Sequence, residues 1–361
     1  SHATIVSANS DSGPESLRQA ITDNKTEEDA ASASSAFGFP AAIPALWSGT
    51  SGTDWNTATN WDNGIVPLTS TDVIIPDVSG ASNNFPSIGG TANCNSLTIG
   101  TGASLSIAVS QTLNIYGDFT NSGTFTANGT TAFKNSDTQT ITGSTTFGDM
   151  LINNVLHVLA GTNMTIAAGS TVMFTTGEDF DFSDGDGSDL GILFVEGELI
   201  ANGTAGNEIP FTRDGSSGYW GSVCIISGTA TSSFTYCNIE YGKAVRGLNG
   251  KYLFGALSFD QSDNISIINC DISNNDWNGI FCRSSSPTIS NSTVSNSSSS
   301  GIYYGDPFTS TATISNCTIS DNYNGVYCNG TGSSDINITE NTICSNQYGV
   351  YCLNASHPDI I

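Results

Sequence analysis

The C-terminal part of the chain repeats one pattern at a nearly constant interval. A glycine followed by isoleucine or valine recurs at intervals of 22, 24 and 24 residues, at Gly279, Gly301, Gly325 and Gly349. A column of aliphatic residues recurs at intervals of 22, 25 and 24 residues, at Ile272, Val294, Ile319 and Ile343. A β-type repeat of this length cannot bury its apolar face alone, so two columns with one period indicate stacked coils.

Within each coil, apolar and polar residues alternate over short segments such as Thr318–Ser320. Alternation with a period of two predicts strands that point every second side chain inward. We therefore expect Ile314, Ile319 and Val326 to face the interior of one coil. Asparagine tolerates left-handed backbone and hydrogen-bonds turns, so we expect a stacked asparagine column at a coil corner. Its expected members lie two or three residues after each aliphatic, at Asn274, Asn296, Asn322 and Asn346.

The composition of the chain limits the fold classes and the kinds of partner that are expected. The 361 residues include 33 acidic and only 8 basic side chains, for a formal net charge of −25. Nucleic acid and anionic membranes repel such a surface, so neither is an expected partner. No apolar run is long enough to span a membrane. Abundant Gly, Ser, Thr and Asn favour short strands joined by turns, which predicts an all-β fold.

Several segments resemble the right-handed parallel β-helix (pectin-lyase-like) family. The repeats described above carry the resemblance, and so do segments Leu193–Ile225 and Cys237–Val245. The tryptophan-rich segment Trp47–Pro76, the segment Leu97–Gly129 and the opening segment Ser10–Ile21 are similar to parts of secreted or cell-surface β-helix proteins of Bacteroidetes-type bacteria. The resemblance implies an all-β, right-handed parallel β-helix solenoid in an extracellular or cell-surface location.

Three regions are expected along the chain. Residues 1–46 form an N-terminal cap or arm with a linker, residues 47–160 a tryptophan-rich opening and β-solenoid domain, and residues 161–361 a right-handed parallel β-helix. Ser16 is a suitable N-cap for a short helix carrying Leu17, Ala20 and Ile21, which would cover the open end of the core. The segment Thr26–Pro44 breaks the repeat and is expected to be a linker or an extended arm.

An acidic, glycine-rich segment gives the sharpest ionic motif. Five aspartates lie within a few residues of each other around Gly185 and Gly187, at Asp179, Asp181, Asp184, Asp186 and Asp189. Closely spaced carboxylates on a glycine-containing turn suit Ca²⁺, which takes oxygen ligands, and they repel one another without a cation. The segment therefore predicts a structural Ca²⁺ site, and the alternative is a solvated acidic turn.

Cysteines form two columns in the repeat. One holds Cys237, Cys270 and Cys317, with Ser292 and Asn341 in the same position, and the other holds Cys282, Cys328 and Cys352, interrupted by Tyr304. Neighbouring coils lie about 4.8 Å apart, which is within disulfide range, so Cys237–Cys270 and Cys328–Cys352 bridges are possible. The alternative is a set of free thiols that fill the coil interior.

An enzymatic interpretation depends on basic residues. Lys243, Arg246, Lys251 and Arg283 are half of the basic residues of the chain. Polysaccharide lyases neutralise a uronate carboxylate with such cations, and the segment Glu240–Gln261 is longer than a coil requires, so it is expected to hold an inserted loop beside a groove. The same cations would also neutralise neighbouring carboxylates in a purely structural role. No lyase motif, catalytic triad or nucleophile elbow is found.

The leading functional hypothesis is a non-catalytic extracellular structural or adhesive protein. The alternative is a polysaccharide lyase or a glycan-binding β-helix that acts on acidic polysaccharide. Tyr219, Trp220 and Trp277 are the candidate stacking residues for a glycan, although such aromatics also serve as packing. The expected partners are surface glycans or copies of the chain itself.

The segment Ala355–Ile361 begins a coil as Ser284–Asn291 does, so we expect either that the chain is a fragment of something longer or that it self-associates. Another subunit would complete that coil, with Ala3–Val6 as the donated strand, in a head-to-tail filament.

Overall fold

The computed structural model describes residues 43–81, 84–177, 190–228, 230–305, 311–330, 336–354 and 358–361. Contacts divide the chain into Ser1–Ile43 and Pro44–Ile361, and the described structure lies almost entirely in the second unit. The expected helix at Ser16 and the expected donated strand Ala3–Val6 lie outside the described residues.

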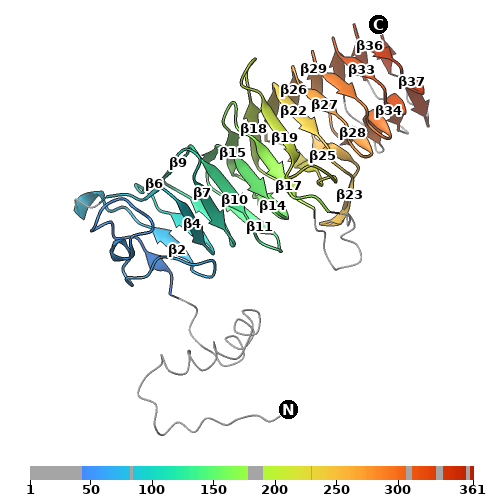
Figure 1. Ribbon diagram of the computed structural model, residues 1–361. Coiled ribbons are helices and arrows are strands. Elements are labelled where there is room, and N and C mark those ends of the chain that lie inside the picture. Colours follow the sequence, from blue (N-terminus) through green and yellow to red (C-terminus); the bar gives the residue numbers. More distant parts are fainter. Residues whose placement is uncertain are drawn as a thin grey trace, which may run out of the picture. The chain divides into compact units, whose positions relative to one another are not determined.

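The described part of Pro44–Ile361 is built from short strands in long parallel sheets (Figure 1). The first sheet contains, in spatial order, β1 (Ala45–Leu46), β2 (Val73–Ile75), β5 (Leu97–Ile99), β8 (Phe119–Asn121), β11 (Gln139–Thr142), β14 (Val155–Val158), β17 (Ile192–Val195), β20 (Val223–Gly228), β25 (Gly255–Ser262), β28 (Asn278–Arg283), β31 (Ser300–Gly305), β34 (Asn324–Asn329) and β37 (Tyr348–Leu353).

The second sheet contains β4 (Thr91–Cys94), β7 (Thr112–Ile115), β10 (Thr130–Phe133), β13 (Met150–Ile152), β16 (Val172–Phe174), β19 (Ile209–Arg213), β22 (Cys237–Glu240), β27 (Asp271–Ser273), β30 (Thr293–Ser295), β33 (Thr318–Ser320) and β36 (Thr342–Cys344). The third contains β12 (Thr145–Phe147), β15 (Asn163–Ile166), β18 (Glu198–Asn202), β21 (Ser232–Thr235), β26 (Ile265–Ile268), β29 (Thr288–Ser290), β32 (Thr313–Ser315), β35 (Asn337–Thr339) and β38 (Asp359–Ile360).

Smaller elements complete the described structure. A short parallel sheet holds β3 (Ser87–Ile88), β6 (Ser104–Ile107) and β9 (Thr124–Ala127), and an antiparallel hairpin holds β23 (Val245–Leu248) and β24 (Lys251–Leu253). Two 3₁₀ turns, η1 (Ala58–Asn60) and η2 (Ser79–Ala81), lie in the tryptophan-rich segment.

The chain visits the sheets in a fixed order, as in β25, β26, β27 and β28, which belong to the first, third, second and again the first sheet. Each strand pairs in parallel with the equivalent strand of the next coil, and Ile272 is in register with Val294, which is in register with Ile319. This confirms the aliphatic column expected from the sequence. The described fold is an all-β parallel β-helix, and its sheets run across residues 160 and 161 without a break.

One continuous apolar core fills the coils from Ala45 to Ile338. The residues expected to face inward in one coil, Ile314, Ile319 and Val326, are all fully buried. Burying an isoleucine or valine side chain contributes roughly 1.5–3 kcal/mol, so the stacked aliphatic columns are the main stabilising feature of the fold. Trp47 and Trp55 each pack edge to face with Trp61 in the N-terminal part of this core, with ring centroids 5.0 and 4.8 Å apart.

The cysteine columns are confirmed, and their thiols are free. Tyr304 is in register with Cys282 on one side and Cys328 on the other, and Cys328 is in register with Cys352. No cysteine forms a disulfide, and the backbone N–H of Cys237 instead donates to the Cys270 sulfur at 3.4 Å. The structure thus has the free-thiol alternative, with most thiols packed in the coil interior.

The expected asparagine column is wrong for two of its four members. Asn322 and Asn346 lie one position after the column that contains Asn274 and Asn296. Asn274, Asn296 and Asp321 occupy one column, have φ values of 58°, 53° and 59°, and are exposed. Left-handed backbone favours Asn, Asp and Gly. The next position is buried, and there Asn322 bonds inward: its amide Nδ2 donates to the carbonyl oxygens of Val294 and Ser320 at 3.1 and 2.9 Å. Each corner therefore pairs an outward and an inward polar residue.

The expected insertion in Glu240–Gln261 is present as the β23–β24 hairpin rather than as a loop. Its residues Val245, Leu248 and Leu253 pack on the outer face of the first sheet, against Ile192 and Cys224 among others. This explains why β17 is buried on both faces. The basic residues expected in a loop lie partly on strands, with Lys251 on β24 and Arg283 on β28 of the first sheet.

Candidate functional site

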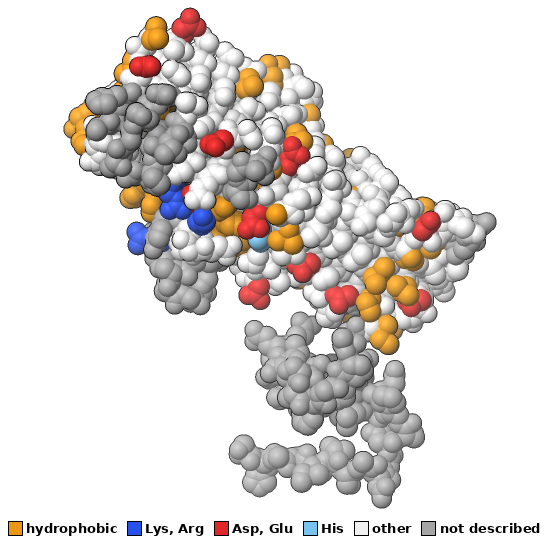
Figure 2. Space-filling view, turned by 180° about the vertical axis from the view of Figure 1, so that it is seen from behind, with side chains coloured by type: hydrophobic (Ala, Val, Ile, Leu, Met, Phe, Trp, Pro, Cys, Tyr) orange, Lys and Arg blue, Asp and Glu red, His pale blue; other side chains and the backbone are white. Residues whose placement is uncertain are grey.

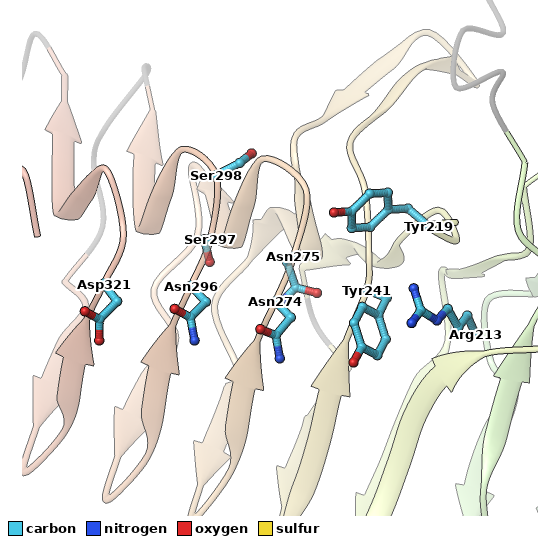
Figure 3. A pocket seen from close by; sticks show the side chains of 9 residues that line it. All are labelled: Arg213, Tyr219, Tyr241, Asn274, Asn275, Asn296, Ser297, Ser298 and Asp321. Carbon is cyan, nitrogen blue, oxygen red and sulfur yellow. The ribbon is translucent and has the colours of Figure 1, made fainter. Parts of the chain in front are cut away.

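A solvent-open groove of about 490 Å³ follows the corner between the second and first sheets (Figure 3). It begins beside β19 and crosses β22, β27, β30 and β33, which are consecutive in the second sheet. Strands in a sheet lie about 4.8 Å apart, so the groove extends about 20 Å along the helix axis. The residues that line it are Arg213, Tyr219, Tyr241, Asn274, Asn275, Asn296, Ser297, Ser298 and Asp321.

The two tyrosines at one end are held in place by Trp220. The Trp220 indole is fully buried and stacks on Phe174, with centroids 4.3 Å apart and planes within 12°. Its Nε1–H donates to the Glu240 carbonyl at 2.6 Å, and its backbone N–H donates to the Tyr241 carbonyl at 3.0 Å. The loop that carries Tyr219 is thereby fixed against the corner that carries Tyr241.

The three aromatic residues that the sequence analysis proposed to stack on a glycan differ in whether a ligand in the groove could reach them. Tyr219 lines the groove and is 37% exposed, whereas the expectation that Trp220 offers its ring to a ligand is wrong, because that ring is 0% exposed. Trp277 is 51% exposed but lies beside the groove and packs near Phe254, with centroids 6.4 Å apart. Tyr241, which the sequence reasoning missed, supplies the second aromatic wall.

Arg213 completes the aromatic end of the groove. Its guanidinium carbon lies 3.7 Å from the centroid of the Tyr241 ring, which is a cation–π contact. Its Nη1 donates to the Gly218 carbonyl at 3.0 Å. Gly218 has a φ of 82°, a left-handed conformation that favours glycine, so the turn that presents this carbonyl depends on that residue. The ring and the carbonyl together orient the guanidinium.

Uncharged polar side chains form the middle of the groove. Asn274 and Asn296 stand in a row at the ends of β27 and β30 and are exposed (Figure 3). Behind them Asn275 is buried, and its Oδ1 accepts a hydrogen bond from the backbone N–H of Gly242 at 2.8 Å. A rigid backbone thus presents amide groups that both donate and accept hydrogen bonds.

The arrangement suits a ligand with apolar ring faces and many hydroxyl groups. Tyrosine rings offer flat, rigid contact area at a low cost in conformational entropy, and Asn and Ser offer adaptable hydrogen bonds. Sugars have both features, since their ring faces carry C–H groups and their edges carry hydroxyls. On the face in Figure 2, acidic side chains are scattered and most of the described surface is neither charged nor hydrophobic.

Two of the four cations of the enzymatic interpretation, Lys251 and Arg283, converge on a single carboxylate. Asp260 is fully buried, and Lys251 Nζ lies 2.7 Å from its Oδ2. Arg283 forms a bidentate pair with Asp260, with Nε and Nη2 donating at 2.9 and 2.8 Å. Burial alone raises the pKa of Asp260, but the hydrogen bonds and charges of Arg283 and Lys251 lower this pKa below its usual value. Lys251 and Arg283 therefore form an ion cluster with Asp260, which agrees with the alternative that these cations neutralise a neighbouring carboxylate.

The five aspartates of the expected Ca²⁺ site, Asp179 to Asp189, all lie outside the described residues. Among the described residues, no group of three or more His, Cys, Asp and Glu side chains is placed to hold a metal. The Ca²⁺ site stays a prediction.

If Ca²⁺ binds in this segment, chelation is expected to lower the melting temperature by several degrees, because a ligand that binds only the folded state stabilises it. Thermal unfolding followed by circular dichroism, with and without a chelator, checks this. The Asp184→Asn variant is the control and should show a smaller shift. An unchanged melting temperature of the parent protein would contradict the prediction.

Within the described residues, no helix has the length and apolar character needed to cross a membrane. The segment Ala355–His357, part of the expected incomplete coil, lies outside them, and head-to-tail self-association stays a prediction.

Two family models match parts of the chain. The model described as "Right handed beta helix region" matches residues 199–361, and the model described as "Domain of unknown function (DUF8693)" matches residues 46–173. No curated protein and no solved structure gives a significant match. All the residues that line the groove, from Arg213 to Asp321, lie within the first matched region. With its parallel sheets and this match, the chain has the fold expected from its sequence, an all-β right-handed parallel β-helix.

Proposed function

We propose that this protein is a non-catalytic extracellular β-helix that adheres to surfaces by binding a glycan in the corner groove. The observation that carries the proposal is the combination of Tyr219 and Tyr241 with a row of exposed asparagines along one groove. The tyrosine rings pack on sugar ring faces, and Asn274 and Asn296 bond sugar hydroxyls. The buried Trp220 fixes the tyrosines before the ligand arrives, which lowers the entropic cost of binding.

A non-catalytic role is favoured because the basic residues with the strongest case for lyase chemistry already have an internal partner. Lys251 and Arg283 both contact the buried Asp260, so their charges serve to neutralise that carboxylate. An extracellular location is supported by the strongly acidic, lysine-poor sequence and by the similarity to right-handed β-helix regions. The runner-up remains a lyase that acts on acidic polysaccharide.

Glycan binding is expected to weaken when the groove loses a tyrosine. The Tyr219→Ala variant should bind roughly tenfold more weakly than the parent protein, since a well-placed aromatic contact contributes about 1.4 kcal/mol or more. A glycan array identifies the ligand, and isothermal titration calorimetry measures the affinity. Tyr219 lines the groove and is partly exposed rather than part of the buried core, so the variant should fold normally.

The matched control is Tyr323→Ala, which removes a 55% exposed tyrosine outside the groove. It should leave the affinity unchanged. Equal loss in both variants, or an array on which nothing binds, would contradict the proposal. The release of unsaturated products from uronic-acid polymers by the purified protein would instead support the lyase.

A further inference from the structure

The corner groove has opposite charges at its two ends. Arg213 lies at the end formed by β19, and Asp321 lies at the other end, after β33 (Figure 3). The lining residues between them are uncharged Tyr, Asn and Ser side chains. A ligand that lies along the groove therefore meets a cation at one end and an anion at the other, and the groove distinguishes the two directions of a linear molecule.

The Arg213 end is built to hold an anion in a defined place. Contact with the Tyr241 ring at 3.7 Å fixes the plane of the guanidinium, and one N–H is used by the Gly218 carbonyl at 3.0 Å. A guanidinium has five N–H donors in a rigid fork that matches the two oxygens of a carboxylate. A carboxylate bound there gains charge-assisted hydrogen bonds, which are about twice as strong as neutral ones.

The Asp321 end of the groove repels a second negative charge on the ligand. Asp321 is exposed at the corner after β33. Asp276, beside the middle of the groove, accepts a hydrogen bond from the groove residue Ser298 at 3.2 Å. The net charge of −25 adds a general repulsion of polyanions. A polymer with a carboxylate on every sugar would place like charges against Asp321, and such contacts oppose binding.

We propose that the groove binds an oligosaccharide in one direction, with a single carboxylate-bearing sugar at Arg213 and neutral sugars toward Asp321. This inference rests on the proposed glycan-binding function and adds the chemical class and orientation of the ligand. Tyr241 has two roles in it, since its ring orients Arg213 and lines the groove next to the first sugar.

The test uses four probes of equal length. The first three are a neutral oligosaccharide, the same chain with one uronic acid at its non-reducing end, and a chain of uronic acids. A fourth probe carries the single uronic acid at the reducing end. Calorimetric titration of the parent protein should show one of the two singly acidic probes bound at least tenfold more tightly than the neutral probe. The fully acidic probe should bind more weakly than that preferred probe.

Two variants assign the effect to residues. Arg213→Gln should remove the preference for the preferred acidic probe, so that its affinity for that probe falls by a larger factor than its affinity for the neutral probe. Arg213→Lys keeps the charge and should restore only part of the preference. Asp321→Asn should increase the affinity for the fully acidic probe relative to the affinity for the neutral probe. Circular dichroism of each variant confirms that it is folded.

The outcomes separate this inference from the function on which it rests. Equal binding of neutral and acidic probes, lost in Tyr219→Ala, would overturn the inference and leave glycan binding intact. A preference for the acidic probe that survives Arg213→Gln would also overturn it. Binding of none of the probes, together with an empty glycan array, would overturn both.

Discussion

Replacing Trp220 with alanine is expected to lower the free energy of unfolding by about 3–5 kcal/mol, because it removes a large side chain from a closed core. The ring is fully buried, stacks on Phe174 at 4.3 Å and donates its N–H to the Glu240 carbonyl at 2.6 Å. The substitution leaves a cavity and an unpaired carbonyl. Urea unfolding followed by far-ultraviolet circular dichroism measures the loss.

Trp277→Ala is the matched control for this prediction. Trp277 is 51% exposed, so its removal should change the free energy of unfolding by about 0.5 kcal/mol or less. The Trp220 variant should also lose glycan affinity, because Tyr219 and Tyr241 are no longer held in place. Equal stability of the two variants would contradict the assignment of Trp220 as the anchor of the groove.

Replacing Arg283 with methionine is expected to destabilise the protein by about 3 kcal/mol at pH 7. The change leaves the fully buried Asp260 carboxylate with Lys251 as its charged partner, and breaking a buried ion pair costs more than the pair itself contributes. Methionine preserves much of the apolar stem of arginine, so the loss reports mainly on the charge. Urea unfolding at several pH values checks the prediction.

The same variant has an expected pH dependence. The pKa of Asp260 in the folded parent protein lies below its unfolded value, so the stability contributed by its ionised form is present above about pH 4 and is lost as the pH falls through the folded pKa. The difference in stability between the parent and Arg283→Met should therefore shrink below about pH 4. A difference that stays constant into acid would show that the arginine acts through packing alone.

Much of the fold could be predicted from the sequence because equivalent positions of stacked coils recur at a nearly constant interval along the chain. The columns at Ile272 and Gly279 recur with one period, and the structure places their members in register. The cysteine columns were predicted for the same reason. The residues that belong to one column can be found by counting from one strand to the next in the sequence, without knowledge of the tertiary structure.

The asparagine corner was predicted less well because two neighbouring columns carry the same residue type. Asn274 and Asn296 point outward, whereas Asn322 and Asn346 occupy the next position and bond inward. A count from Ser273 and Ser320, which the structure places in equivalent positions, separates the two columns. The repeat period alone does not separate them, because the coils differ in length by up to three residues.

The candidate site was predicted only in part. Tyr219 was named from its aromatic character, but the same reasoning named Trp220, and one sequence offers no means to tell which of two adjacent aromatics is buried. Tyr241 was missed although a signal exists: it follows β22 as Asn274 follows β27 and occupies the same left-handed corner, with φ of 64°. Its contact with Arg213 joins two different coils, and such contacts depend on how the loops between strands pack.

The role of Lys251 and Arg283 also required the structure. Their partner Asp260 lies on β25, and the three residues meet only because β24 folds back as a hairpin and β28 pairs with β25. Asp260 occurs in the sequence among several other acidic residues, so its burial could not be recognised from the pattern.

The most direct test of the account is a crystal structure of the protein with an oligosaccharide that the glycan array identifies. The account predicts a sugar ring on the face of Tyr219 or Tyr241, sugar hydroxyls bonded to Asn274 and Asn296, and a carboxylate at Arg213. A sugar bound anywhere else on the β-helix would contradict the assignment of the groove.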